Sequence, residues 1–330
     1  MFNLAPSPPH PGAVGPHLFD DACSSGVVLL AGQPLPDAVD RLLKAREALT
    51  DKAAEEVAAG LTKLADRIAA AIEASIGAGT PEQIRLHVLG VQLDDCLDIL
   101  EGIVDEDGNP ILAATQQAWV ERLRELSALA EETAEAADII KRDDARLDSE
   151  GYTAALTGQY QNEAAFWDTA VTRPLGNRVL RGLNGSLFGV SLKETAETIA
   201  DETRLSIPQA YTEARTETAA FDRLVAAETA HAADPDGDRL VWLYVGPVDG
   251  LQRPFCAALI SKDRMFWTRD QVGSLRNNQP GMPALLHGGG YNCRHQWVQM
   301  HRQTAERRGY RPATAADVAA AGIAAMSKRR

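Results

Sequence analysis

The sequence predicts a mainly α-helical protein with long helices, a small α+β domain at the C-terminal end and an extended N-terminal arm. Three observations lead to this fold class. Apolar residues recur at helical spacing through long alanine-rich stretches between residues 37 and 171. Seven of the 17 prolines lie within the first 36 residues. Three of the five tryptophans lie after residue 230, in short segments without helical spacing.

Size and composition exclude several classes of protein. A chain of 330 residues, 45% of them hydrophobic, is long enough for about two domains and a sizeable core. Four cysteines are too few for a disulfide-based scaffold. No run of 18 apolar residues occurs, and the N-terminus lacks the basic and apolar regions of a secretory signal. We therefore expect neither a signal peptide nor a membrane partner.

The net charge of −13 is unevenly distributed. Residues 1–150 carry 28 acidic and 12 basic side chains, whereas residues 231–330 carry 8 acidic and 14 basic ones. The net charges of these two regions are therefore −16 and +6. This asymmetry indicates two surfaces with different partners, or else a solvated acidic helical face and scattered arginines.

We divide the chain into a proline-rich arm over 1–36, an extended helical region over 37–190 and a C-terminal domain with a basic tail over 191–330. Proline removes backbone donors and fixes φ, so the first segment is predicted to be an arm. The helical region either forms an antiparallel bundle or packs against other proteins, and its total length favours the second arrangement.

The helical region contains four predicted helices. The first begins at Asp37 and ends at Gly77. The second begins after the N-cap Thr80 and continues through Leu100. The third is expected over 112–147, which corresponds to about 54 Å. The fourth is expected over 152–171.

The remaining elements follow from caps, turn residues and β-branched runs. Residues 172–190 are glycine-rich and are predicted to be a connector. Ser191 and Glu194 form a capping box for a helix that ends near a turn at 205–208, after which another helix begins. Residues 241–245 form a strand and residues 265–268 a shorter one. A short helix is expected after Thr268, loops at 280–283 and 288–290, and a final helix after Thr314.

The strongest chemical pattern consists of two cysteines and two histidines. Cys256, His287, Cys293 and His295 have the spacing C-x30-H-x5-C-x-H. Two thiolates and two imidazoles suit tetrahedral zinc, although the usual C-x2-C pair is absent. A Cys256–Cys293 disulfide formed in an oxidising medium is a second interpretation. We favour a third, in which buried cysteines and hydrogen-bonded histidines tether the loops of a small domain.

The same residues could also form a catalytic site in which the thiol of Cys293 is the nucleophile, but few sequence features favour this interpretation. Arg294 next to Cys293 would lower the pKa of the thiol, and the amides of 288–290 are the only oxyanion donors that can be identified. Proximity in sequence does not supply the geometry that such a mechanism needs.

Charged residues define two further candidates. Arg215 and Glu217 are two positions apart in a helix and cannot pair with each other. They are either a polar anchor between this helix and the C-terminal domain or two exposed charges. The second candidate is a basic stretch interleaved with aromatic residues, which would contact nucleic acid or be solvated. The candidate DNA contacts are Arg302, Arg307, Arg308, Lys328, Arg329 and Arg330.

Several of these motifs occur in a recognisable order. Ala214-Arg215-Thr216-Glu217 lies in a helix, and a strand with Trp242 follows. Asp249 and Arg253-Pro254-Phe255-Cys256 come next, and the segment His287 to Trp297 contains G-G-G-Y-N-C-R-H. This order resembles the C-terminal domain of phage head-morphogenesis proteins, the Mu F-like minor head proteins, over about residues 191–300. Cys256 lacks a second cysteine three residues away, and His295 stands where many relatives carry cysteine, which weakens the zinc interpretation.

The resemblance implies a non-enzymatic minor virion protein. Such a protein would lie at or near the portal inside the head, after assembly in the host cytoplasm. Its partners would be the portal protein or the major capsid protein, together with packaged double-stranded DNA. The family motif would comprise Arg215, Thr216, Glu217, Trp242, Asp249, Arg253 and Arg294. The alternative function is a metal- or Cys/His-dependent hydrolase or nuclease that uses Cys256, His287, Cys293 and His295.

Overall fold

The computed structural model describes residues 35–76, 81–141, 165, 167–186, 191–248, 252–260, 264–280 and 282–326. Within these residues the fold is mainly α-helical with a small α+β region, which confirms the predicted fold class. The predicted arm, most of the predicted fourth helix, Asp249 and the basic residues 328–330 lie outside the described residues.

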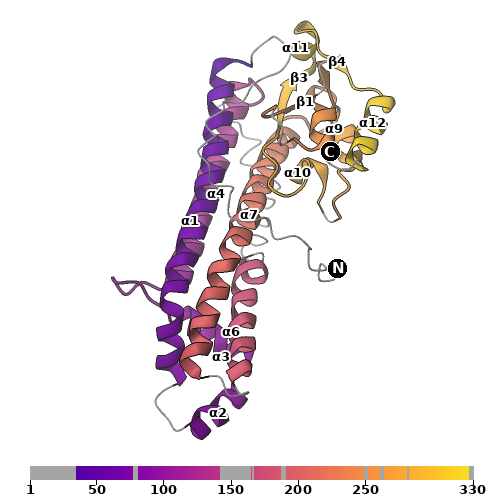
Figure 1. The fold of residues 1–330 in the computed structure, drawn as a ribbon. Helices are drawn as coiled ribbons and strands as arrows, with labels where there is room; N and C mark the ends of the chain where they lie inside the picture. Colours follow the sequence, from indigo (N-terminus) through magenta and orange to yellow (C-terminus); the bar gives the residue numbers. More distant parts are fainter. Residues whose placement is uncertain are drawn as a thin grey trace.

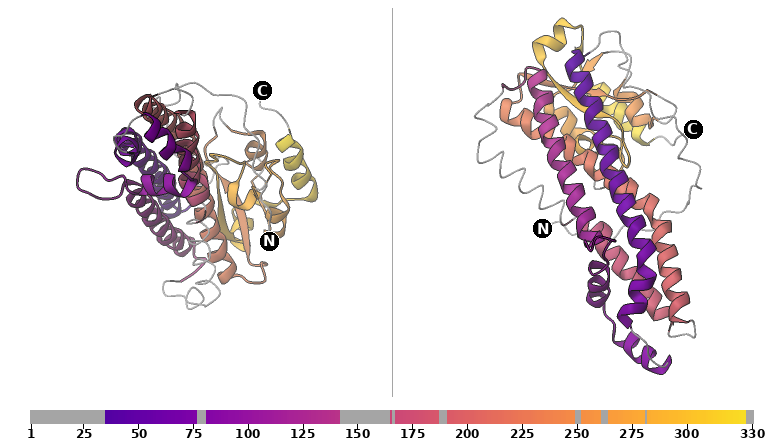
Figure 2. Two further views of the ribbon diagram at one scale, coloured as in Figure 1. Left: turned by 90° about the horizontal axis from the view of Figure 1, so that it is seen from below. Right: turned by 90° about the vertical axis from the view of Figure 1, so that its left-hand side faces the viewer.

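Three long helices lie side by side and form a rod, with shorter helices at one end and the small C-terminal region at the other (Figures 1 and 2). The helices of the rod are α1 (Asp37–Ile76), α2 (Pro81–Gly90), α3 (Leu93–Glu101), α4 (Ile111–Ala136), α6 (Arg173–Ser186) and α7 (Leu192–Ala233).

The helix α1 has the predicted bounds. Its 40 residues correspond to about 60 Å at 1.5 Å per residue. Its buried residues recur at helical spacing and face α4 and α7. Ala53 and Ala54 are fully buried in this stripe, where their small side chains allow the helices to approach closely.

The main core runs between α1, α3, α4, α6 and α7. Trp119 of α4 is its largest fully buried side chain, and its ring packs at 5.7 Å from that of Trp167. The indole Nε1 of Trp119 donates to Oγ1 of Thr218 on α7 at 2.9 Å, so the polar atom of this buried ring is satisfied.

The predicted third helix is too long, because α4 ends at Ala136. Asp138 has a φ of 59°, and the amide of Ile139 returns to the carbonyl of Ala134. A left-handed residue with such a bond ends a helix. Ile139 and Ile140 are then buried in the core of the C-terminal region instead of continuing the helix.

The prediction of a connector over 172–190 is also wrong, since residues 173–186 form α6. The glycines mark close packing of helices. A Cβ at Gly176 would lie 2.6 Å from Cδ2 of Leu97 on α3, and one at Gly182 would lie 2.4 Å from Cγ1 of Ile199 on α7. Tertiary packing therefore outweighs the low helix propensity of glycine. A π-helical turn, η1 (Asp168–Thr172), precedes α6.

Two predicted helix boundaries differ as well. Residues 205–208 do not form a turn, because α7 is a single helix of 42 residues that contains Pro208. This part of α7 is exposed, so water can solvate the carbonyl that Pro208 leaves without a donor. In contrast, the predicted helix over 81–100 is broken after Gly90, and α3 begins anew after the capping box of Gln92 and Asp95.

The described residues of the C-terminal region form two small sheets. Strand β1 (Leu240–Val245) pairs antiparallel with β3 (Gln296–His301), and β2 (Met265–Phe266) pairs parallel with β4 (Arg311–Pro312). In the first sheet Leu240 lies opposite His301. Side chains on its two faces alternate, as expected for strands. One face packs on the start of α1, and the other carries Trp242, Tyr244 and Trp297 into the C-terminal core.

Short helices complete this region: α8 (Pro254–Leu259), α9 (Arg269–Ser274), α10 (Ala284–His287), α11 (Arg302–Arg307) and α12 (Ala315–Met326). Thr268 caps α9, as predicted. The helix α7 contributes to the cores of both the rod and the C-terminal region, so the two predicted regions share it. No helix among the described residues has the length and apolarity needed to cross a membrane.

Candidate functional site

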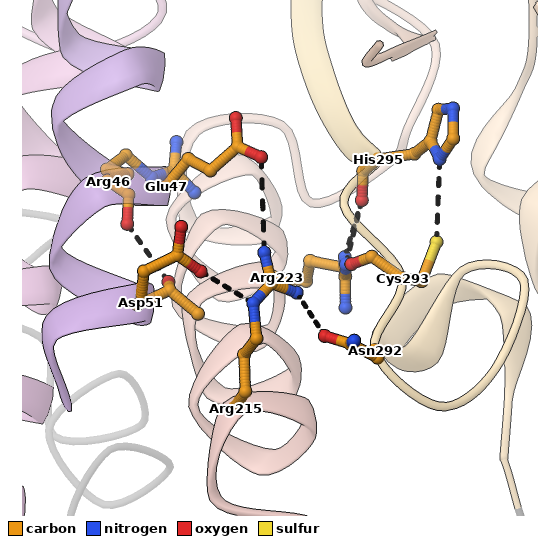
Figure 3. Close-up of polar contacts among 9 residues, drawn as sticks. Arg46, Glu47, Asp51, Arg215, Arg223, Asn292, Cys293 and His295 are labelled. Atoms are coloured by element: carbon orange, nitrogen blue, oxygen red, sulfur yellow. Dashed lines mark hydrogen bonds and ion pairs between the residues drawn. The ribbon is translucent and has the colours of Figure 1, made fainter. Parts of the chain in front are cut away.

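The polar junction between the rod and the C-terminal region is built from α1, α7 and the loop before β3 (Figure 3). Beside the junction, Arg46 of α1 and Asp222 of α7 form an ion pair within the rod. The distance from Nε of Arg46 to Oδ1 of Asp222 is 2.7 Å, and both side chains are 2% exposed. A buried pair contributes little net stability but makes the loss of either partner costly, and it therefore fixes how α1 and α7 align.

Arg215 connects three segments of the chain. Its Nε donates to Oδ1 of Asp51 on α1 at 2.6 Å, and its Nη1 donates to Oδ1 of Asn292 at 2.8 Å. The amide of Asn292 donates to Oγ1 of Thr216 at 2.9 Å. The side chain of Arg215 is buried, so these bonds agree with the first of the two alternatives, a polar anchor between this helix and the C-terminal domain.

Arg223 is a further buried arginine of α7 that was not predicted from the sequence. Arg223 lies about two helical turns after Arg215 on α7. Its buried side chain donates to the carbonyl oxygens of Leu286, Cys293 and His295 at 2.7–3.0 Å. A guanidinium offers five donors in a rigid fork, so one side chain satisfies three carbonyls of an irregular segment. The available signal was Asp222-Arg223 inside an otherwise apolar, alanine-rich stretch of α7.

Three of the four predicted Cys/His residues come together next to this junction. Sγ of Cys256 lies 3.8 Å from Sγ of Cys293, which lies 3.7 Å from Nδ1 of His295. All three residues are buried. The hydroxyl of Tyr244, which was not predicted, lies 3.5 Å from each sulfur.

His287 does not belong to this group. Its Nε2 lies 3.9 Å from Oε1 of Glu217 on α7, and its buried Nδ1 has no hydrogen-bond partner. Burial lowers the pKa of His287 to about 4 and raises the pKa of Glu217 to about 7. These two side chains therefore form a separate, weakly polar contact between α7 and α10.

The surroundings of Cys256 and Cys293 shift the pKa values of their thiols in opposite directions. The pKa of Cys293 is lowered, chiefly because the thiol of Cys256 hydrogen-bonds to its sulfur, with His295 and the charge of Arg223 acting in the same direction. The same bond and burial raise the pKa of Cys256. Burial also raises the pKa of Tyr244 well above its ordinary value. Cys293 is thus the first of these groups to ionise.

Three other residues of the predicted family motif, Trp242, Arg253 and Arg294, lie near the junction or in the C-terminal core. Trp242 is buried, and its backbone exchanges two hydrogen bonds with that of Trp267. Arg253 donates to the carbonyl of Tyr291 at 2.6 Å. Arg294 is partly exposed and lies near enough to the junction to lower the pKa of Glu47, although burial raises it more.

Three of the predicted DNA contacts, Arg302, Arg307 and Arg308, lie in or next to the short helix α11. Arg302 donates to the carbonyl of Asp238, and its guanidinium lies 5.9 Å above the ring of Phe266. Arg307 is exposed and Arg308 partly so, at the end of α11. Trp297 is one of the aromatic residues interleaved with the basic stretch. It is fully buried and its Nε1 donates to the carbonyl of Ala284, so its ring cannot stack on a nucleic-acid base.

No family model matches this chain, and no curated protein or solved structure is significantly similar to it.

Proposed function

We propose that this chain is a phage minor head protein, which attaches to the portal or the major capsid protein during head assembly. One observation carries the proposal. Residues of the two motifs that resemble the Mu F-like domain are 77 positions apart, yet Arg215 and Thr216 both hydrogen-bond Asn292. The motif residues thus form one structural unit, as expected if their order reflects a shared fold.

The shape of the chain supports a role in attachment. A rod about 60 Å long carries a small region that is fixed to one end by Arg215 and Arg223. The rod includes most of the acidic surplus of residues 1–150, which suits protein contacts and repels DNA. The basic surplus of residues 231–330 suits the packaged double-stranded DNA.

The alternative of a hydrolase or nuclease has less support. A nucleophile or catalytic metal must be reached by its substrate, and a catalytic zinc keeps an open coordination position. Cys256, Cys293 and His295 are each at most 4% exposed. Their burial favours a structural role for the cluster.

Co-assembly tests the proposal. The chain is co-expressed with the portal and major capsid proteins of the same genome, and the head particles are isolated by sedimentation. The wild-type chain should sediment with the particles. The Arg215→Ala variant should be incorporated less, whereas Arg204→Ala, which alters an exposed arginine of α7, should be incorporated normally. A chain that never enters particles and hydrolyses nucleic acid by itself would contradict the proposal.

A further inference from the structure

Four polar side chains of the C-terminal core converge on one point. They come from three separate segments: Tyr244 from β1, Cys256 from α8, and Cys293 and His295 from the loop that leads into β3. The ligand atoms of Cys256, Cys293 and His295 all lie within 4.8 Å of one another. Polar side chains in an apolar core are normally paired by hydrogen bonds or by a metal ion.

Four of the six distances between these ligand atoms match those of a tetrahedron around a zinc ion. With Zn–S bonds of about 2.3 Å and Zn–N or Zn–O bonds of about 2.0 Å, tetrahedral ligands lie about 3.8 Å apart for two sulfurs and about 3.5 Å apart for a sulfur and a nitrogen or oxygen. The Sγ atoms of Cys256 and Cys293 are 3.8 Å apart, and Sγ of Cys293 is 3.7 Å from Nδ1 of His295. The hydroxyl of Tyr244 is 3.5 Å from both sulfurs.

The surroundings of His295 orient its ring for metal binding. Nε2 lies 3.1 Å from the carbonyl oxygen of Pro247, which can only accept a hydrogen bond. Nε2 therefore carries the proton of the neutral ring, and Nδ1 presents its lone pair to Cys293. Ligating histidines commonly donate their second ring nitrogen in this way. The ring of Tyr244 stacks on that of His295 at 5.3 Å and holds it in place.

The backbone is shaped around the same point. A Cβ at Gly289 would lie 2.4 Å from Sγ of Cys256, and one at Gly246 would lie 2.4 Å from Cδ2 of His295. Gly288 has a φ of 53°, which favours glycine. The amide of Gly289 donates to Sγ of Cys293 at 3.3 Å, a bond that stabilises the thiolate form.

We propose that Cys256, Cys293 and His295 bind a structural zinc ion, with the hydroxyl of Tyr244 at the fourth position. Binding displaces one proton from each thiol into solution, so two thiolates, a neutral imidazole and a neutral phenol leave the buried site without net charge. Four protein ligands leave no open position for a substrate. The ion joins β1, α8 and the loop before β3 at one point of the C-terminal core. The proposal does not depend on the function proposed above.

Metal analysis of the full-length chain tests the proposal. The chain is purified without a histidine tag, and its zinc content is measured by mass spectrometry. We expect one zinc per chain in the wild type and less than about a tenth of that in Cys256→Ser and Cys293→Ser. Cys96→Ser is the matched control, since Cys96 is equally buried but lies in the core of the rod. This variant should keep its zinc.

A second measurement covers the case in which a cysteine variant does not fold. The wild-type chain is stripped of metal and titrated with Co²⁺, whose visible absorption reports tetrahedral thiolate ligation. We expect strong d–d bands with one equivalent, and weaker binding by about 10-fold or more in Tyr244→Phe. Folded wild-type protein without zinc, in which Cys256 and Cys293 are free thiols or a disulfide by intact mass, would overturn the proposal. Unchanged Co²⁺ affinity and spectrum in Tyr244→Phe would remove tyrosine from the ligand set.

Discussion

The guanidinium of Arg215 donates to the side-chain oxygen of Asn292 at 2.8 Å, and this bond joins the middle of α7 to the loop that precedes β3. The same guanidinium donates to Asp51 of α1 at 2.6 Å. One buried arginine therefore connects both halves of the molecule. Lysine can replace it only in part, because a single ammonium lacks the planar fork that reaches two partners in different directions.

We predict that Arg215→Ala lowers the free energy of unfolding by about 2 kcal/mol, since it leaves the polar groups of Asp51 and Asn292 without their donor. Arg215→Lys should lose about half as much. Arg204→Ala removes an arginine with two exposed acidic partners and should change the free energy by less than about 0.5 kcal/mol. Urea unfolding followed by tryptophan fluorescence measures all three variants. Equal losses for Arg215→Ala and Arg204→Ala would show that the junction is not stabilising.

The buried pair of Arg46 and Asp222 gives a second prediction. Asp222→Asn should cost about 3–5 kcal/mol, because it leaves the charge of Arg46 buried without compensation. The double variant Arg46→Met/Asp222→Leu should be more stable than Asp222→Asn, because it removes both charges. A double-mutant cycle on the same unfolding assay measures this coupling. Additive effects would contradict a direct interaction between the two side chains.

Stability should decrease as pH rises through the range in which Glu217 ionises. The folded-state pKa of about 7 lies above the ordinary value of 4.5, so the folded state binds more protons between these values. The stability that Glu217 contributes is therefore present below about pH 4.5 and is lost as pH approaches 7.

The pKa of His287 is shifted in the opposite direction, from 6.5 to about 4, so this residue costs stability as pH falls through that range. Glu217→Gln removes only the first effect. The variant should gain about 1–2 kcal/mol over the wild type on going from pH 5 to pH 8, measured by urea unfolding. A constant difference between the two proteins across this range would contradict the raised pKa.

DNA binding is tested on the basic surface of α11. Replacing both Arg307 and Arg308 with alanine should weaken retention of double-stranded DNA by the full-length chain. It should also reduce the slope of log affinity against log salt by about one for each lost phosphate contact. Arg204→Ala, on the acidic rod, is the control and should leave both values unchanged. Binding that is absent in the wild type at low salt would exclude the DNA contact.

Local sequence signals predicted the elements whose ends are set by local chemistry. The helix α1 begins after Pro36 and ends before Gly77, Ser191 has the predicted capping box, and α9 begins after Thr268 as predicted. Elements whose limits depend on packing were not predictable in this way. Glycines at 176 and 182 were interpreted as signs of a connector, although they allow α6 to approach its neighbours. Residues 205–208 were interpreted as a turn, although α7 continues through Pro208.

In the candidate site, too, the residue types could be predicted from the sequence, whereas their contacts in the fold could not. The residue types in C-x30-H-x5-C-x-H indicated a cluster, and three of the four residues do meet. Sequence spacing alone does not show that His287 faces Glu217 instead, nor that Tyr244, from a strand 12 residues before Cys256, completes the group. Arg223 was missed because its partners are backbone carbonyls, which leave no pattern in the sequence.

Electron microscopy of head particles that contain the labelled chain tests the central claim most directly. If the chain is a minor head protein, the label should lie inside the particle, at or near the portal vertex. Label that is absent from intact particles, or that remains with free protein at every stage of assembly, would contradict the account.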